Sequence, residues 1–187
     1  MKKMAIGSMK KYRIIYADPP WDYGPTKRIK YPTMSTQSIC DLPIRELAED
    51  NSTLFMWTTA TKLADAIRVM KAWGYKYITC LVWDKQVPAG MSSHYARIQH
   101  ELLLIGGKGS SKPHVSGNIG TSPNSIKTPN SIISIKKTRH SVKPEWFAEY
   151  IDKFWPEGNR IELFARRARA GWDVWGNEAP GSIDLEE

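Results

Sequence analysis

The chain has 187 residues, of which 41% are hydrophobic and 25% charged, so it suits one globular domain with a full hydrophobic core. It contains no apolar run of about 18 residues that would predict a membrane span, and its first residues are too polar for a signal peptide. Cys40 and Cys80 are not in a metal-ligand spacing, so we expect reduced thiols, no metal site and a cytoplasmic location.

Strands and helices are predicted to alternate in the first half of the chain. Three runs of β-branched and aromatic residues predict buried strands, at 12–17, 52–59 and 77–85. Ser35 and Pro43 each predict the start of a short helix. A longer helix follows Lys62 and ends at Gly74, and four apolar residues are predicted to form its inner face: Leu63, Ile67, Met70 and Trp73. Such alternation predicts a parallel sheet with crossover helices.

The second half is predicted to hold loops and the remaining elements. Between 86 and 131 we expect mobile loops that face a substrate, with a strand at 100–109 between them. A helix is predicted from Pro144, and three apolar residues are predicted to form its inner stripe: Phe147, Ile151 and Phe154. Further strands are predicted at 131–137, 160–166 and 171–178. We find no repeat and expect one α/β domain over residues 1–187.

Basic and aromatic residues are abundant. The net charge is +8, and the chain has eight Trp and eight Tyr residues. Cations suit phosphates and aromatic rings suit bases, so this composition fits nucleic-acid binding. A charged surface that serves only solubility is the alternative, and composition does not decide between the two.

The motif DPPW, at 18–21, follows the first predicted strand. Two prolines cannot continue a central strand, and a carboxylate at the end of a parallel strand lies where α/β sheets bind ligands. We expect Asp18 and a free proline carbonyl to accept the two N–H groups of a planar amine, with Trp21 as a stacking wall. An amine oriented in this way can take a methyl group from a sulfonium donor. The alternative is an ordinary Asp-Pro turn with a core Trp.

A series of further motifs follows DPPW: YPTMS, LFMWTT, AWGYKYITCLVWDK, HELLLIGGKG, SVKPEWF and RIELFARRARAGWDVWGNE. In this order they resemble the MT-A70 family of adenine-N6 methyltransferases, from about Tyr12 to Glu178. The resemblance implies a Rossmann-like fold, S-adenosyl-L-methionine as cofactor, and a catalytic motif that precedes the cofactor-binding segment. The chain resembles the short prokaryotic or phage members of the family.

The resemblance also implies roles for individual residues. Asp18, Pro19, Pro20 and Trp21 would form the catalytic corner, with Asp18 near both the amine and the methyl donor. Two residues match positions at the adenine pocket: Tyr31 and Glu101. The cofactor would be lined by Lys143, Glu162, Phe164, Arg166, Asn177 and Glu178. In a strand, 162 and 164 would share one side. The alternatives are a solvated Lys143, a surface Glu101, and a Glu162 that only pairs with an arginine.

One departure and several functions remain open at this stage. Ala168 and Arg169 replace a His-Asn pair that contacts the cofactor in eukaryotic members, and Arg169 is a candidate substitute. The resemblance favours adenine-N6 methylation of DNA over RNA, and the intact DPPW favours an enzyme over a non-catalytic nucleic-acid-binding subunit. Methylation of cytosine N4 fits the motifs less well. A homodimer is expected from the family.

Overall fold

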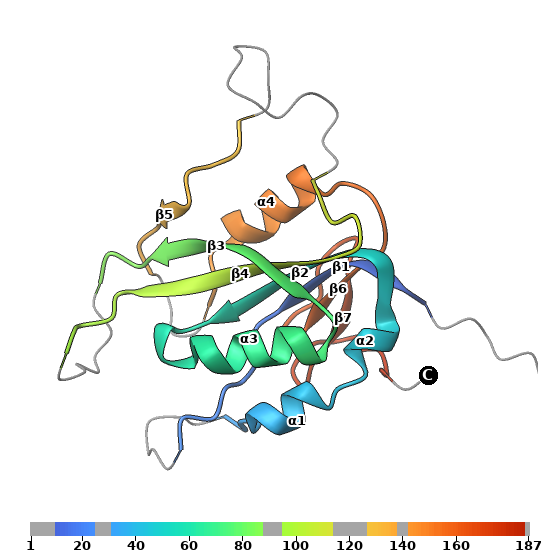
Figure 1. The fold of residues 1–187 in the computed structure, drawn as a ribbon, viewed down its shortest axis with the longest axis horizontal. Helices are drawn as coiled ribbons and strands as arrows, with labels where there is room; N and C mark the ends of the chain where they lie inside the picture. Colours follow the sequence, from blue (N-terminus) through green and yellow to red (C-terminus); the bar gives the residue numbers. More distant parts are fainter. Residues whose placement is uncertain (1–9, 25–30, 88–94, 114–126, 138–141, 186–187) are drawn as a thin grey trace, which may run out of the picture.

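The central feature of the fold is one seven-stranded sheet, seen in the computed structural model of the chain in the order β5-β3-β4-β2-β1-β6-β7 (Figure 1). The strands are β1 Tyr12–Ala17, β2 Ala48–Thr58, β3 Lys76–Asp84, β4 His100–Lys108, β5 Ile132–Ser134, β6 Arg160–Leu163 and β7 Asp173–Trp175. The structure describes residues 10–24, 31–87, 95–113, 127–137 and 142–185. β4 is antiparallel to both of its neighbours and all other pairs are parallel, which confirms the predicted α/β class with a mostly parallel sheet.

Helices cover both faces of the sheet. Residues of α1 (Thr36–Cys40), α2 (Ile44–Leu47) and α3 (Leu63–Ala72) pack on one face, and α4 (Glu145–Phe154) packs on the other (Figure 1). A short 3₁₀ turn, Ala60–Lys62, leads into α3. None of the helices in the described ranges is long and apolar enough to cross a membrane.

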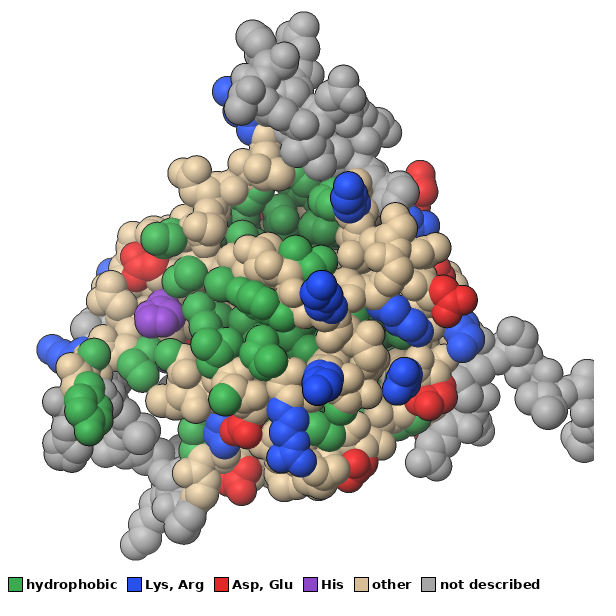
Figure 2. Space-filling view, in the orientation of Figure 1, with side chains coloured by type: hydrophobic (Ala, Val, Ile, Leu, Met, Phe, Trp, Pro, Cys, Tyr) green, Lys and Arg blue, Asp and Glu red, His purple; other side chains and the backbone are tan. Residues whose placement is uncertain are grey.

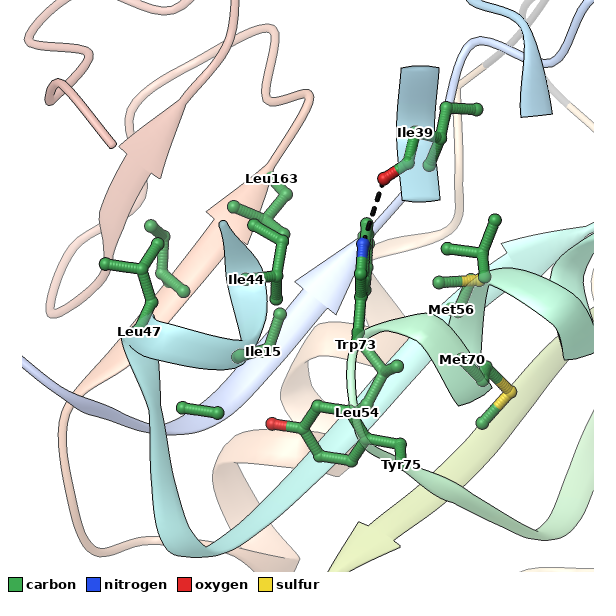
Figure 3. Close-up of a cluster of buried hydrophobic side chains, with 14 of the residues drawn as sticks. Ile15, Ile39, Ile44, Leu47, Leu54, Met56, Met70, Trp73, Tyr75 and Leu163 are labelled. Carbon is green, nitrogen blue, oxygen red and sulfur yellow. Dashed lines mark hydrogen bonds between the residues drawn. The ribbon is translucent and has the colours of Figure 1, made fainter. Parts of the chain in front are cut away.

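Two apolar clusters follow from the alternation of side chains along each strand. In β1, Ile15 and Ala17 face α1–α3, whereas Ile14 and Tyr16 face α4. Figure 3 shows the first cluster, in which the indole N–H of Trp73 donates to the carbonyl of Ile39 at 2.9 Å. That bond satisfies a fully buried polar group and ties α1 to the end of α3.

Several predicted helix boundaries are confirmed. The hydroxyl of Ser35 accepts the N–H of Ser38 at 3.0 Å and caps α1. Gly74 follows α3 with φ +84°, a left-handed conformation that glycine adopts without strain. Pro144 caps α4, and its predicted inner stripe is buried: Phe147, Ile151 and Phe154.

The predicted inner face of α3 is partly wrong. Met70 and Trp73 are buried, but Leu63 is 38% and Ile67 37% exposed. Ala66 and Val69 face the sheet instead, and these smaller side chains let the helix backbone approach it closely. Figure 2 shows apolar side chains at the surface in the region where Figure 1 draws α3 and β3.

The last strands are shorter than predicted. β6 ends at Leu163, because Phe164 has φ +62°, which breaks the extended conformation. Phe164 therefore does not share a side with Glu162: it packs against the same cluster as Leu163. β5 and β7 each have three residues.

Within the segment 86–131 the strand predicted at 100–109 is confirmed as β4, which lies between β3 and β2 inside the sheet. Residues 88–94 and 114–126 lie outside the described residues, so substrate-facing loops there stay a prediction.

Candidate active site

The charged side chains of the site gather at one edge of the sheet. All strands except β4 end at this edge, and β4 begins there because it is antiparallel. Asp18 follows β1 and Lys85 follows β3, while Glu101 stands at the start of β4. Lys143, just before α4, reaches the same edge. The topology thus assembles groups that are up to 125 positions apart in the sequence.

A chain of ion pairs links these four residues. The ammonium of Lys143 donates to Asp18 Oδ2 at 2.6 Å and lies 3.3 Å from Glu101 Oε2. The other oxygen of Glu101 lies 2.6 Å from Nζ of Lys85. The side chains of Lys143 and Glu101 are only 16% and 18% exposed. A solvated lysine and a surface glutamate, the alternatives that the sequence left open, do not fit this arrangement.

Pairing between opposite charges shifts the pKa values of Glu101 and Lys143. Burial would by itself raise the pKa of Glu101, but the ammonium groups of Lys143 and Lys85 outweigh it and hold that pKa below its usual value. Burial would lower the pKa of Lys143, but the carboxylates of Asp18 and Glu101 outweigh it and raise that pKa. Both groups are therefore charged at neutral pH.

A second ionic cluster surrounds Glu162 on β6. Arg169 donates through Nε to Glu162 at 3.2 Å and through Nη1 to Glu145 at 2.9 Å. Burial raises the pKa of Glu162, the arginine opposes that shift, and the charge of Asp18 adds to it. Arg169 is thus held between two carboxylates, and its role as a cofactor contact in place of the missing His-Asn pair stays a prediction.

The proline corner differs from the sequence prediction in two ways. Its carbonyls are not free: the oxygen of Pro19 accepts the N–H of Trp21, and that of Pro20 accepts the N–H of Met34, both at 2.9 Å. Trp21 is only 4% exposed and belongs to the apolar core, so it offers no open stacking wall. Each carbonyl keeps a second lone pair, and Asp18 stays partly exposed beside them.

Trp57, near the end of β2, packs beneath the proline corner and is hydrogen-bonded to it. Its carbonyl accepts the indole N–H of Trp21 at 3.2 Å, and its own indole donates to the hydroxyl of Tyr16 at 2.7 Å. The ammonium of Lys143 lies 5.3 Å from the centre of its ring. Sequence reasoning missed Trp57 and Lys85 as site residues, although each stands at the end of a predicted strand.

The segment after β7 carries the predicted ribose contacts. Asn177 and Glu178 lie in an exposed turn, and a Cβ on Gly176 would come 2.2 Å from the carbonyl oxygen of Ala165. The backbone N–H of Ala165 donates to the backbone carbonyl of Trp175 at 2.9 Å. Close backbone contact therefore fixes this turn against the segment after β6, and only glycine fits at 176.

Tyr31 and Arg166 lie against each other. The guanidinium of Arg166 is 5.6 Å from the centre of the ring of Tyr31, and both residues are exposed. The structure thus brings together a residue predicted at the adenine pocket and one predicted at the cofactor.

The sequence of the chain is similar to known proteins over most of its length. A sequence model of the MT-A70 family matches residues 12–178. The chain belongs to the MT-A70 family. It is 34% identical to the Type II methyltransferase M.MunI of a Mycoplasma species, over 91% of this chain and 79% of that protein. It is 29% identical to the human N(6)-adenine-specific methyltransferase METTL4 and 25% identical to the human N(6)-adenosine-methyltransferase catalytic subunit METTL3.

The lengths of these relatives differ. The match to METTL4 spans 90% of this chain but 38% of METTL4. The match to METTL3 spans 97% of this chain but 30% of METTL3. The predicted family is confirmed, and so is the predicted enzyme class, an adenine-N6 methyltransferase. The roles of individual residues stay predictions. Within the described ranges, no three His, Cys, Asp or Glu residues are grouped so that they could hold a metal ion.

Proposed function

We propose that this protein transfers the methyl group of S-adenosyl-L-methionine to N6 of adenine in DNA. The observation that carries the proposal is the carboxylate of Asp18 at the end of β1, followed by two prolines and held by Lys143 at 2.6 Å. A fixed carboxylate beside carbonyl oxygens is a receptor for a planar amine, and a neighbouring cation holds that carboxylate in place.

The residues present fit the cofactor. Lys143 has three N–H donors and directs two of them at Asp18 and Glu101, so one is left for a carboxylate such as that of the methionine part. The amide of Asn177 and the carboxylate of Glu178 suit vicinal ribose hydroxyls, and they follow β7, which runs parallel to β6. When bound, the cofactor would supply an electrophilic methyl group on a sulfonium.

The chain's own residues orient the amine. Asp18 accepts one N–H of N6, and a second lone pair of a proline-corner carbonyl accepts the other, so the nitrogen lone pair points away from both acceptors. As the methyl group passes to N6, its bond to the sulfonium sulfur would break and leave a neutral thioether. N6 becomes cationic, and its surplus proton, which lies in the hydrogen bond to Asp18, passes to water. Lys143 holds the carboxylate in place throughout.

DNA is favoured over RNA by similarity. The chain is 34% identical to the bacterial Type II methyltransferase over 79% of that protein, but 25% identical to METTL3 over 30% of that protein. The RNA substrate is the second candidate, because METTL3 is named for adenosine. The homodimer and the cytoplasmic location stay predictions, and sedimentation at micromolar concentration tests the homodimer.

Labelled methyl transfer to matched DNA and RNA oligonucleotides tests the proposal. We expect transfer to adenine-containing DNA and its loss in Asp18→Ala. Asp50→Asn is the matched control, since this carboxylate is fully exposed on β2 at the opposite edge of the sheet. Wild-type protein that binds both polymers but transfers no methyl group to either would instead be a non-catalytic binding subunit. Transfer to RNA alone would refute the choice of DNA.

A further inference from the structure

A cleft of about 410 Å³ lies beside the proposed site, between the β3–β5 end of the sheet and the start of α4. Its wall is formed by Trp83, Ile135, Lys136, Val142, Lys143, Pro144, Glu145, Trp146 and Arg167. Its volume is at the small end of ligand sites and suits a single nucleotide better than a larger ligand.

The aromatic side chains of the cleft are held in fixed orientations. The indole N–H of Trp83 donates to the carbonyl of Ile135 at 2.8 Å. Trp146 stacks on Tyr150 with 5.5 Å between ring centres and an angle of 4°, and Phe147 meets it edge-on. Rings that are fixed in advance lose little entropy when a planar ligand stacks on them.

The charge of the cleft favours an anion. Three of the residues that line it are cationic and one is acidic. Lys143 and Arg167 have carboxylate partners, and Lys136 is exposed at the rim. A ligand with a planar ring and a phosphate could stack on the aromatic side chains and place its phosphate at the cationic ones.

The cleft adjoins the amine site but is separate from it. Lys143 lines the cleft and also donates to Asp18, and Trp83 meets Trp57 edge-on at 6.1 Å. Asp18 itself is not among the residues that line the cleft. An amine that must reach Asp18 therefore lies on the other side of Lys143.

We infer that this cleft binds the nucleotide next to the target adenine in the same strand. Its base would stack on Trp146, and its phosphate would lie at Lys136 and Arg167. The inference rests on the proposed function and adds to it a subsite at which the enzyme binds the nucleic-acid strand. Stacking is tolerant of base identity, so this subsite holds the strand without choosing its sequence.

Binding of single-stranded DNA and RNA oligonucleotides, followed by fluorescence anisotropy at several salt concentrations, tests the inference. We expect Trp146→Ala to weaken binding about 5- to 150-fold, the usual range for loss of one stacked base. Lys136→Ala should reduce the slope of log K against log salt by about 0.7, as for one lost phosphate contact. Lys71→Ala, which removes an exposed lysine from α3 on the other face, is the matched control.

Two further measurements keep the outcomes distinct. Trp146→Phe retains a ring and should recover most of the affinity, whereas a loss caused only by misfolding would also appear in the thermal melt. With methyl transfer as readout, the cleft variants should raise KM for the oligonucleotide and leave kcat nearly unchanged. Cleft variants that bind like Lys71→Ala overturn the inference even if methylation proceeds. Weakened binding without any methylation by wild type would support the cleft and refute the enzyme.

Discussion

The change Lys143→Met tests how the ionic chain holds the site together. Methionine has a similar length and flexibility, so it keeps the packing against Trp57 while it removes the charge. Asp18 and Glu101 then each lose a cationic partner, and Glu101 keeps Lys85 alone.

The expected cost follows from the exposure of the partners. A hydrogen bond to a charged group contributes about 1.5–3 kcal/mol. The side chain of Asp18 is 35% exposed, so water screens its pair with Lys143, and the contact of Lys143 with Glu101 is long at 3.3 Å. We therefore expect the two contacts together to contribute about 2–3 kcal/mol to the free energy of unfolding. For a chain of this length that corresponds to a fall in Tm of about 4–12 °C.

Thermal melting at pH 7 measures this fall, and a double-mutant cycle with Asp18→Asn isolates the pair. Lys62→Met is the matched control: its ammonium pairs with one carboxylate, Asp65, at 2.9 Å and with similar exposure, so we expect a loss of at most about 1 kcal/mol. The reasoning fails if Lys143→Met melts within about 1 °C of wild type, or if the cycle is additive within about 0.5 kcal/mol. Methyl transfer by Lys143→Met should also fall, with a raised KM for the cofactor.

Three other substitutions test separate parts of the site. The lowered pKa of Glu101 contributes stability above the pKa of the unfolded carboxyl, about 4.3, and this contribution is lost as pH falls through the lower folded pKa. In Glu101→Gln the decline of Tm between about pH 5 and pH 3 should therefore be shallower, and an unchanged decline would contradict the pairing. Gly176→Ala should lower stability by about 1–3 kcal/mol and weaken cofactor binding in calorimetry, since its Cβ would meet the carbonyl of Ala165 at 2.2 Å; unchanged affinity would separate this turn from the cofactor site. Trp21→Phe removes the donor to Trp57 and should lower the free energy of unfolding by about 1 kcal/mol while leaving oligonucleotide affinity unchanged, whereas weakened binding would restore a stacking role for Trp21.

Local sequence patterns predicted much of the fold. The apolar runs predicted the strands because buried parallel strands need continuous apolar residues, and Ser35, Gly74 and Pro144 marked helix boundaries through their own backbone chemistry. The two prolines ended β1 where predicted, because neither can donate to the sheet. The order of motifs also predicted the family.

Packing between elements decided what local patterns missed. The inner face of α3 depends on how closely the helix approaches the sheet, which the apolar spacing of 63, 67, 70 and 73 does not contain. The burial of Trp21 likewise depends on Trp57 and Met34, which come from other parts of the chain.

The sequence by itself determined the residue types at the site, the end of the first strand and the family. Only the tertiary structure decided that Lys143 lies between Asp18 and Glu101, that Lys85 completes this chain, and that Arg169 is held between two carboxylates. For Glu101 the physical reason is the reversed direction of β4. Its start, and not its end, lies at the edge where the other strands end, and strand direction is set by long-range pairing that no local pattern records.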